Sequence, residues 1–146
     1  MINLKDTQRA NVSVGFDGLV RKRYSGPSCA QRFANEVRVL THLNELGCPF
    51  TPKLVDVDKD SLEVVMTHCG CEAPMVSEEK ANALFEELKN GFGVEHGDPF
   101  SRNITYNTRT GDFNIIDFEY AMILDTGVGF TIEKENLHRK LFAGEN

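Results

Sequence analysis

The clearest chemical pattern in this sequence joins the segments 96–103 (HGDPFSRN) and 115–119 (IIDFE). Asp98 and Asn103 lie five residues apart, and Asp117 follows fourteen residues after Asn103, behind two apolar residues. The interval between Asn103 and Asp117 is about that of a short β-hairpin. Carboxylate and amide oxygens are the ligands that hard cations such as Mg²⁺ prefer, and a carboxylate can accept a proton from a hydroxyl group. Three such residues at this spacing are far more specific than an isolated Asp-x-x-x-x-Asn.

The two segments resemble the catalytic loop and the metal-binding loop of the protein kinase-like phosphotransferases, especially the aminoglycoside phosphotransferase and choline kinase branch. That branch has His-Gly-Asp where protein kinases usually have His-Arg-Asp, and the match covers roughly residues 12–122. The resemblance implies ATP and Mg²⁺ as cofactors, with Asp98 as catalytic base, Asn103 as catalytic residue and metal ligand, and Asp117 as principal Mg²⁺ ligand. The alternative is that Asp98 and Asn103 are ordinary loop residues and that Asp117 ends a strand.

The first third of the chain reads as strands followed by one helix. Residues 12–14 and 19–24 are strand-like and flank residues 15–18 (GFDG), in which Asp-Gly is typical of a hairpin turn. Alternation along the second strand places one set of side chains on a common face, namely Val20, Lys22 and Tyr24.

A helix is predicted to begin at Ser28, where residues 28–31 (SCAQ) match a capping box, and to end at Gly47. Its apolar stripe consists of Phe33, Val37, Leu40 and Leu43. Glu36 lies on or beside this stripe, where a carboxylate needs a partner because an unpaired buried charge is costly. Lys22, on the preceding strand, is the natural partner.

In kinase-like folds a strand lysine pairs with a glutamate of the following helix and holds the α- and β-phosphates of ATP. By this resemblance Lys22 is a catalytic and ATP-binding residue, and Glu36 is its partner at the nucleotide site. The alternatives are an exposed strand lysine within a basic cluster and a half-exposed helix glutamate.

Residues 50–57 and 62–66 are predicted to form two further strands, and the second leads into a hinge at residues 67–71. By resemblance, backbone groups of this hinge meet adenine, and the cofactor-binding residues there are Met66, Thr67 and Cys69. Met66 would lie behind the base, and the alternative for it is a plain core methionine. His68 is predicted to be solvated.

Two more helices are predicted in the second half of the chain. One runs from 77 to about 90 and ends at Gly91, and its core face consists of Ala81, Leu84, Phe85 and Leu88. The other runs from 131 to about 142 and is predicted to pack two leucines, Leu137 and Leu141.

These elements predict an α+β fold. By resemblance it is a minimal protein kinase-like fold, with a small antiparallel-sheet N-lobe carrying one helix and a strongly truncated helical C-lobe. The 146 residues are predicted to be a single domain, with the N-lobe at about 1–66, the hinge at 67–71 and the reduced C-lobe at 72–146. Residues 103–106 and 113–116 supply the small hairpin expected between the two loops.

Three departures from the kinase-like pattern change what is expected. No G-x-G-x-x-G precedes the first hairpin, so a first strand within residues 1–11 would be followed by a loop without glycine. Glu119 replaces the glycine of the metal loop, and we expect it to face solvent, with a further metal oxygen as the alternative. Few residues follow Met122, so the helical platform that docks substrates is nearly absent. We therefore expect a homo-oligomer, or binding of a partner, through the reduced C-lobe.

Composition excludes several classes of partner. A net charge of −6 without a basic block argues against nucleic acid, and no apolar run approaches the ~20 residues of a membrane span. The N-terminus lacks the layout of a signal peptide, so a cytoplasmic location is the default expectation. The four cysteines lack the paired spacing of a structural zinc site, and we expect reduced thiols.

The sequence therefore predicts a kinase-like phosphotransferase that moves the γ-phosphoryl group of ATP to a hydroxyl acceptor, either a small molecule or a protein Ser/Thr side chain. The main alternative is a nucleotide-binding pseudokinase of weak or no activity that acts by protein interaction. A third hypothesis is a structural fragment whose apolar face is completed by a second copy. Asp98 argues against a pure scaffold, because binding ATP does not need a base.

Overall fold

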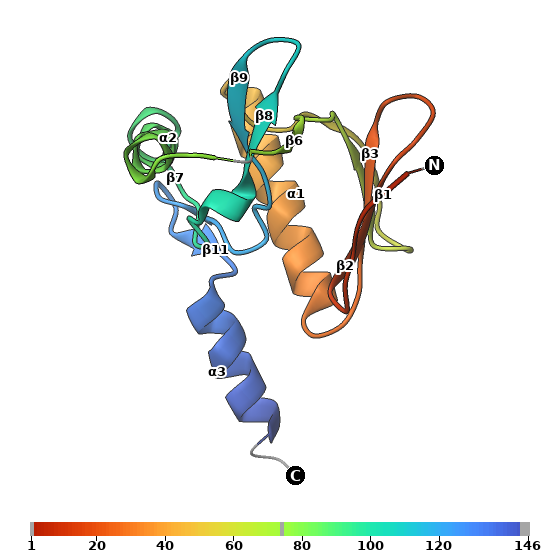
Figure 1. The fold of residues 1–146 in the computed structure, drawn as a ribbon. Helices are drawn as coiled ribbons and strands as arrows, with labels where there is room; N and C mark the ends of the chain where they lie inside the picture. Colours follow the sequence, from red (N-terminus) through yellow and green to blue (C-terminus); the bar gives the residue numbers. More distant parts are fainter. Residues whose placement is uncertain (1, 74, 144–146) are drawn as a thin grey trace.

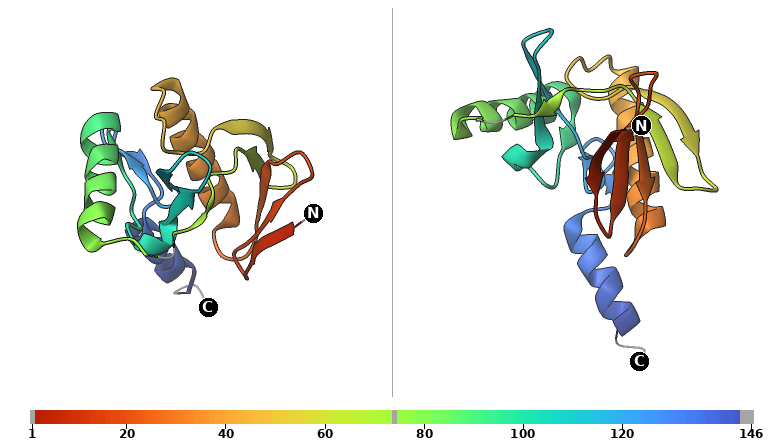
Figure 2. Two further views of the ribbon diagram at one scale, coloured as in Figure 1. Left: turned by 45° about the horizontal axis from the view of Figure 1, so that its top comes forward. Right: turned by 45° about the vertical axis from the view of Figure 1, so that its right-hand side comes forward.

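The computed structural model describes residues 2–73 and 75–143, which form an α+β fold with three antiparallel sheets and three α-helices. Helix α1 (Cys29–Glu45) lies between the largest sheet and the elements of the second half of the chain (Figures 1 and 2). One buried cluster continues from the sheet through α1 to those later elements, and it includes Val39, Leu40, Leu43, Val64, Leu88, Ile104 and Ile115.

The largest sheet has the strand order β1-β2-β3-β5-β4, and every neighbouring pair is antiparallel. Its strands are β1 (Ile2–Asp6), β2 (Ala10–Val14), β3 (Val20–Tyr24), β4 (Leu54–Asp58) and β5 (Glu63–Met66). The predicted hairpin between β2 and β3 is confirmed, and Gly18 supplies the positive φ of 78° that its turn needs. The predicted alternation is confirmed too, since Val20, Lys22 and Tyr24 are all buried.

Helix α1 begins directly after Ser28, as predicted, but the capping-box mechanism is wrong. Ser28 has a left-handed backbone, with φ 56°, and its side chain makes no capping hydrogen bond. A capping side chain needs an extended backbone at this position to reach the first free N–H groups. The predicted stop at Gly47 is confirmed: Gly47 has φ 71°, and its N–H donates to the carbonyl of Asn44 at 3.0 Å.

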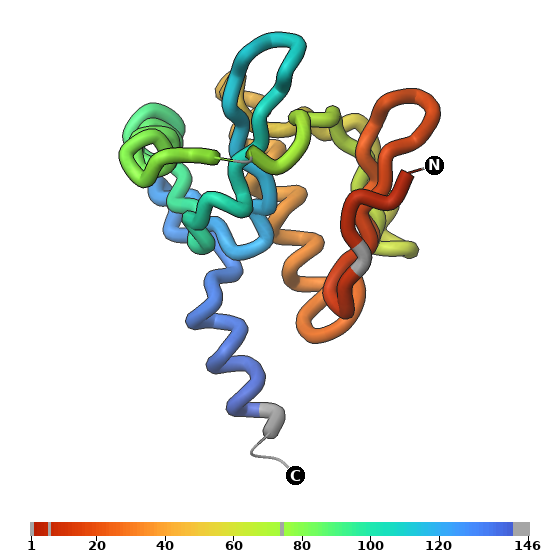
Figure 3. The backbone as a smooth tube through the Cα atoms, in the orientation of Figure 1, coloured from red at the N-terminus to blue at the C-terminus, as the bar shows by residue number. Residues whose placement is uncertain are grey.

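The second half of the chain contains helix α2 (Glu78–Phe92) and two small sheets. The first small sheet joins β6 (Cys71–Glu72), β8 (Ile104–Asn107) and β9 (Asp112–Ile115), and the second joins β7 (Val94–Glu95), β10 (Met122–Ile123) and β11 (Val128–Gly129). A single 3₁₀ turn (Ser101–Asn103) precedes β8. The β8–β9 hairpin is the one predicted from the sequence, and the tube of Figure 3 shows it returning the chain toward α1.

The predicted end of α2 at Gly91 is wrong. The helix continues to Phe92, and Gly93, with φ 68°, ends it by donating its N–H to the carbonyl of Lys89 at 3.0 Å. The predicted start is confirmed, because the hydroxyl of Ser77 accepts a hydrogen bond from the Lys80 N–H at 3.1 Å.

Helix α3 (Ile132–Ala143) extends away from the rest of the molecule (Figure 1). The prediction that Leu137 and Leu141 pack against the core is wrong, since both side chains are exposed. By contrast, Leu84 and Leu88 of α2 are buried, so within the described residues α3, and not α2, lacks apolar cover. Self-association through this half stays a prediction. None of the described helices combines the length and the apolar character needed to cross a membrane.

Candidate functional site

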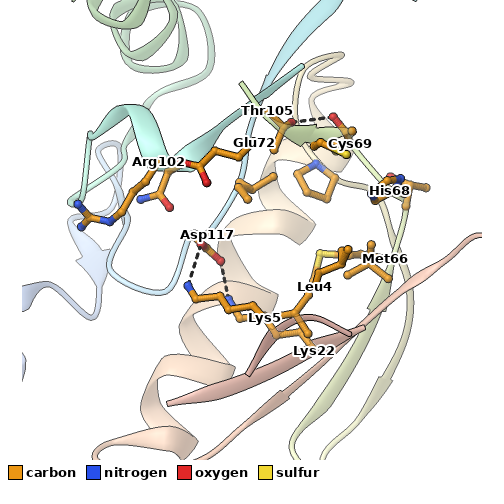
Figure 4. Close-up of a pocket in the computed structure, with 18 of the residues that line it drawn as sticks. Leu4, Lys5, Lys22, Met66, His68, Cys69, Glu72, Arg102, Thr105 and Asp117 are labelled. Atoms are coloured by element: carbon orange, nitrogen blue, oxygen red, sulfur yellow. Dashed lines mark hydrogen bonds and ion pairs between the residues drawn. The ribbon is translucent and has the colours of Figure 1, made fainter. Parts of the chain in front are cut away.

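Two adjacent cavities share one wall. The first has a volume of about 570 Å³ and lies between the largest sheet and residues 66–72, and the second has a volume of about 680 Å³ and lies between the β1–β2 turn and α3. Five of the lining residues are common to both cavities, namely Lys5, Lys22, Arg102, Asn103 and Asp117. Figure 4 shows the first cavity, with Lys5 and Lys22 both pointing at Asp117.

Lys22 is the centre of a buried charge cluster. It is only 4% exposed, and its Nζ lies 2.8 Å from Oε1 of Glu36 and 2.8 Å from Oδ1 of Asp117. A third carboxylate, that of Glu119, lies 3.1 Å away. The predicted ion pair between β3 and α1 is therefore confirmed, and one ammonium group contacts three carboxylates, one from α1 and two from the loop at residues 117–119.

The pKa values in this cluster follow from burial and from the shared charge. Burial opposes protonation of Lys22, but Asp117 and Glu36 outweigh it and raise the lysine pKa well above its ordinary value. Burial likewise opposes ionisation of Asp117, but Lys22 holds the pKa of that carboxyl below its ordinary value. Burial raises the pKa of Glu36, against the pull of Lys22. Lys22 and Asp117 are thus a charged pair.

Helix α1 also holds the loop that carries Asp117. The second oxygen of Glu36 accepts the backbone N–H of Phe118 at 2.6 Å, and the side-chain amide of Asn35 donates to the carbonyls of Glu119 and Ala121, each at 2.9 Å. Asp117 has a positive φ of 63°, which Asp tolerates better than most residues. Sequence reasoning missed Asn35, although its place beside Glu36 on the buried side of the helix was a signal.

Asp98 is held in place by the two residues at the end of its loop. The side-chain amide of Asn103 donates to the Asp98 carbonyl at 2.9 Å and to Oδ2 at 3.0 Å, and an Arg102 guanidinium N–H donates to Oδ1 at 2.6 Å. Gly97 must be glycine here, because it has φ 82° and a Cβ would collide with the Tyr120 carbonyl. The predicted pair Asp98 and Asn103 therefore meets directly, and Arg102 is an ion-pair partner that sequence reasoning missed.

His96 joins the two loops. It is buried, its Nε2 lies 2.8 Å from the carbonyl oxygen of Ile116, and the Asp98 N–H donates to its Nδ1 at 3.2 Å. Because Nδ1 accepts a hydrogen bond, Nε2 must carry the proton and the ring is neutral. Burial lowers the pKa of His96, against the raising effect of the Ile116 carbonyl and of Asp117 and Asp98. This ring is a structural bridge, and no proton-transfer role follows from it.

Folding stability should fall as the pH drops below about 6.5, the ordinary pKa of histidine, because the unfolded chain then protonates His96 while the folded chain keeps it neutral. The expected slope from this residue is at most about 1.4 kcal/mol per pH unit. Denaturant unfolding between pH 5 and 8 measures it. His96→Gln should flatten the profile, and His68→Gln, at an exposed position, is the control. An equally steep profile in His96→Gln would contradict the assignment.

The first cavity has an apolar wall and a polar floor. Apolar lining side chains come from both sides of it and include Leu4, Val12, Val20, Met66 and Ile116. The expected hinge residues Thr67 and Cys69 also line it, and exposed His68 agrees with the prediction. However, the Thr67 N–H donates to the Lys53 carbonyl at 3.0 Å, and the Cys69 carbonyl accepts the Thr105 hydroxyl at 2.6 Å. Those two backbone groups are therefore engaged within the protein.

The prediction that Glu119 faces solvent is wrong. Its carboxylate lies between Lys22 and a guanidinium N–H of Arg32, at 3.1 and 3.4 Å. Arg32 is fully buried and also donates to the Pro27 carbonyl at 2.9 Å and to the Arg9 carbonyl at 3.3 Å. Arg32 was missed from the sequence, but it lies one helical turn before Glu36, and that spacing was the available signal.

One carboxylate on α3 anchors the far side of the second cavity. Oε1 of Glu135 lies 3.1 Å from a guanidinium nitrogen of Arg9 and 3.1 Å from one of Arg139, and the Tyr120 hydroxyl donates to Oε2 at 3.1 Å. Burial, together with the negative charge of Glu135, raises the pKa of Tyr120 to about 12. Nothing in the local sequence pattern predicted this cluster, which also attaches α3 to the rest of the molecule.

The cysteines and the possible metal ligands are further candidate reactive groups among the described residues. All four cysteines are free, and the pKa of the Cys69 thiol is raised to about 11 by burial. No group of three or more His, Cys, Asp or Glu side chains is placed to hold a metal ion in residues 2–73 and 75–143. Any cation site at Asn103 and Asp117 would therefore take its remaining ligands from water or from a bound molecule.

No protein-family model matches this chain, and no curated protein matches it significantly. The chemistry of the two cavities must therefore be argued from their residues. Together they contain a charged lysine against a carboxylate, an amide beside a second carboxylate, and an apolar pocket next to them. This set can hold a polyanion, a hard cation and a hydroxyl group close together.

Proposed function

We propose that this protein is an ATP- and Mg²⁺-dependent phosphotransferase with a small protein kinase-like fold, which transfers the γ-phosphoryl group to a hydroxyl acceptor. The observation that carries the proposal is the shared wall. Lys22, Asn103 and Asp117 line both cavities, while Asp98 lines only the second. A nucleotide in the first cavity and an acceptor in the second would meet at this wall.

The first cavity suits the nucleotide. Its volume lies within the range of about 300–1,000 Å³ that is usual for small-molecule sites, and its apolar side chains can enclose a planar base. Lys22 keeps its charge and is fixed by Glu36, so it can neutralise phosphate oxygens at the inner end. Because two backbone groups of Thr67 and Cys69 are already bonded, adenine would use the remaining backbone groups of residues 67–71.

The residues at the shared wall fit a magnesium ion. The Asn103 amide nitrogen is turned toward Asp98, which leaves its carbonyl oxygen as the atom available to a cation, and Asp117 is ionised. Magnesium keeps several waters and commonly binds one or two protein oxygens together with substrate phosphates, so two protein ligands suffice. When bound, the ion would neutralise charge on the phosphates.

Asp98 lines the second cavity, where it would act on the acceptor. In the proposed step the acceptor hydroxyl gives its proton to the Asp98 carboxylate, and its oxygen forms a bond to the γ-phosphorus of ATP. The bond from that phosphorus to the bridging oxygen of the β-phosphate breaks, and ADP leaves. Asn103 orients Asp98 through its hydrogen bond to Oδ2. Arg102 must release Oδ1 when the acceptor binds.

At the β1–β2 turn a charged side chain would take the role that a glycine-rich loop has in kinase-like folds. Residues 7–9 (TQR) contain no glycine, so backbone amides cannot wrap the phosphates in the usual way. Lys5 precedes this turn, and its Nζ lies 3.9 Å from Oδ2 of Asp117. Lys5, which lines both cavities, would thus cover the phosphates with a side-chain cation.

A non-catalytic nucleotide-binding module is the second candidate, and one observation favours it. Both carboxylates needed for catalysis are already paired, Asp117 with Lys22 and Asp98 with Arg102. A module that only binds nucleotide would keep the pair of Asp98 with Arg102, whereas an enzyme must open it in each cycle. Measured phosphoryl transfer decides between the two.

Nucleotide binding should depend on Mg²⁺ through Asp117. At a ligand concentration of 100 times Kd, Mg²⁺-ATP should stabilise the protein by about 2.7 kcal/mol, visible as a thermal shift. Asp117→Ala should abolish the part of the shift that Mg²⁺ adds to ATP, because the principal metal ligand is lost. Asp125→Ala, at an exposed position, is the matched control. A Mg²⁺-dependent shift that survives in Asp117→Ala would remove the basis for this site.

A further inference from the structure

The second cavity has a surplus of accessible positive charge. Among the described residues that line it, five are lysine or arginine, namely Lys5, Arg9, Lys22, Arg102 and Arg139, and four are carboxylates, namely Asp98, Asp117, Glu119 and Glu135. The small formal surplus stands out against a chain with a net charge of −6. The positions of the positively and negatively charged side chains matter more than their numbers.

The cations are at the surface of this cavity and the carboxylates are beneath them. The side chains of Lys5, Arg9, Arg102 and Arg139 are 37–58% exposed, whereas those of the four carboxylates are 4–26% exposed. A molecule entering from solvent therefore meets guanidinium and ammonium groups first. Potentials of this sign attract anions and repel cations.

Glu135 is shared by more cations than it can neutralise. Arg9 and Arg139 both approach the same oxygen at 3.1 Å, and the buried Arg32 lies 4.0 Å from the other oxygen. One negative charge thus faces three guanidinium groups. Arg9 also donates to the Tyr120 hydroxyl, and both Arg9 and Arg139 line the second cavity, so the positive charge there exceeds what Glu135 can neutralise. Arginine is over-represented where proteins bind carboxylate or phosphate groups, because its planar guanidinium can donate two parallel hydrogen bonds to them.

We infer that the acceptor is a small hydroxyl compound that carries an anionic group, phosphate or carboxylate, held by Arg9 and Arg139 while its hydroxyl reaches Asp98. This inference rests on the proposed function and specifies its substrate class. A cavity of about 680 Å³ has the size of a small-molecule site, which favours such a compound over a protein side chain. A cationic acceptor would face repulsion from four exposed cations.

The test is direct binding to the second cavity, measured by isothermal titration calorimetry with the first cavity filled by Mg²⁺ and a non-hydrolysable ATP analogue. The probes are glycerol 3-phosphate, glycerate, glycerol and choline, which share a hydroxyl group and differ in charge. The two anions should bind at least tenfold more tightly than glycerol or choline. The stronger of the two anions identifies phosphate or carboxylate as the recognised group.

Variants on α3 connect the binding to the named residues. Arg139→Gln should weaken anion binding about tenfold, and Arg139→Lys should restore part of it. Lys140→Gln removes the same charge from the next residue, which is exposed and lines neither cavity, and should leave binding unchanged. Equal effects of Arg139→Gln and Lys140→Gln, or choline binding as well as the anions, would overturn the inference.

If the proposed phosphotransferase function is wrong, the titrations give a result that differs from the one expected when only the acceptor class is wrong. In the first case the ATP analogue does not bind, and the same titrations are run without it. Because Arg139 lies outside the first cavity, loss of anion binding in Arg139→Gln would then still establish the anion site. If the analogue binds and the anions do not, the substrate class is wrong and the nucleotide site stands.

Discussion

Replacing Asp98 by asparagine is expected to lower the rate of phosphoryl transfer by about 10²–10⁴-fold while ATP affinity stays near that of the wild type. The change keeps the shape of the side chain and removes the oxygen that would accept the hydroxyl proton. Asp98 lines the second cavity and not the first, so no side chain that lines the proposed nucleotide site is replaced. Transfer of labelled phosphate from ATP to acceptors, or to water, measures the rate, and calorimetry measures the affinity.

The matched control for this substitution is Asp112→Asn, at an exposed position in the β8–β9 hairpin, which should change neither quantity. Two outcomes would contradict the assigned role. If Asp98→Asn loses ATP binding as well, Asp98 is a nucleotide-site or structural residue. If the wild type transfers no phosphate under broad conditions and the variant binds ATP equally well, the protein is a nucleotide-binding module.

Replacing Lys22 by methionine is expected to reduce the free energy of unfolding by about 3–5 kcal/mol, because it leaves buried carboxylates without their cation. Glu36, Asp117 and Glu119 all lie within 3.1 Å of the Lys22 Nζ, and the lysine is 4% exposed. Denaturant unfolding at pH 7 measures the change. Lys53→Met removes a lysine from an exposed position and should cost far less.

The pH dependence of this loss gives an independent check. Lys22 holds the pKa of Asp117 below its ordinary value of about 3.9, so the stabilisation from this pair is present above that pH and is lost as the pH falls through the folded-state pKa. The deficit of Lys22→Met should therefore narrow as the pH falls below about 3.9. Lys22→Met combined with Glu36→Gln should recover part of the loss, since one unpaired charge is removed. A deficit equal to that of Lys53→Met would show that the cluster contributes nothing to stability.

Residue spacing, together with the resemblance to kinase-like folds, predicted the Lys22–Glu36 pair. The two-residue period of a strand places Lys22 on the buried face, and the 3.6-residue period of a helix places Glu36 on the stripe that covers it. The loops around Asp98 and Asp117 were also predictable, because a hairpin of known length separates them and brings Asn103 to Asp98. The ion pair and the two loops depend on the residue periods of single strands and helices and on short connections, so a sequence pattern can reveal them.

Other features depend on which segments meet in space. Glu119 turns inward only because Lys22 and Arg32, from a strand and a helix far away in the sequence, offer it two cations. The start of α1 was predictable, but the backbone angle of Ser28 that rules out its cap was not. The exposure of Leu137 and Leu141 likewise follows from how α3 is attached, which is through Glu135 and not through its leucines.

The sequence by itself determined the three helices, the two hairpins β2–β3 and β8–β9, the burial of Lys22 and Glu36, and the carboxylate and amide groups that can do chemistry. Only the tertiary structure decided that these groups form the wall between two cavities and that Arg9 and Arg139 converge on one carboxylate. The physical reason is that periodic patterns report which face of an element is buried, whereas the charge lining a cavity is set by distant segments whose packing no local pattern encodes.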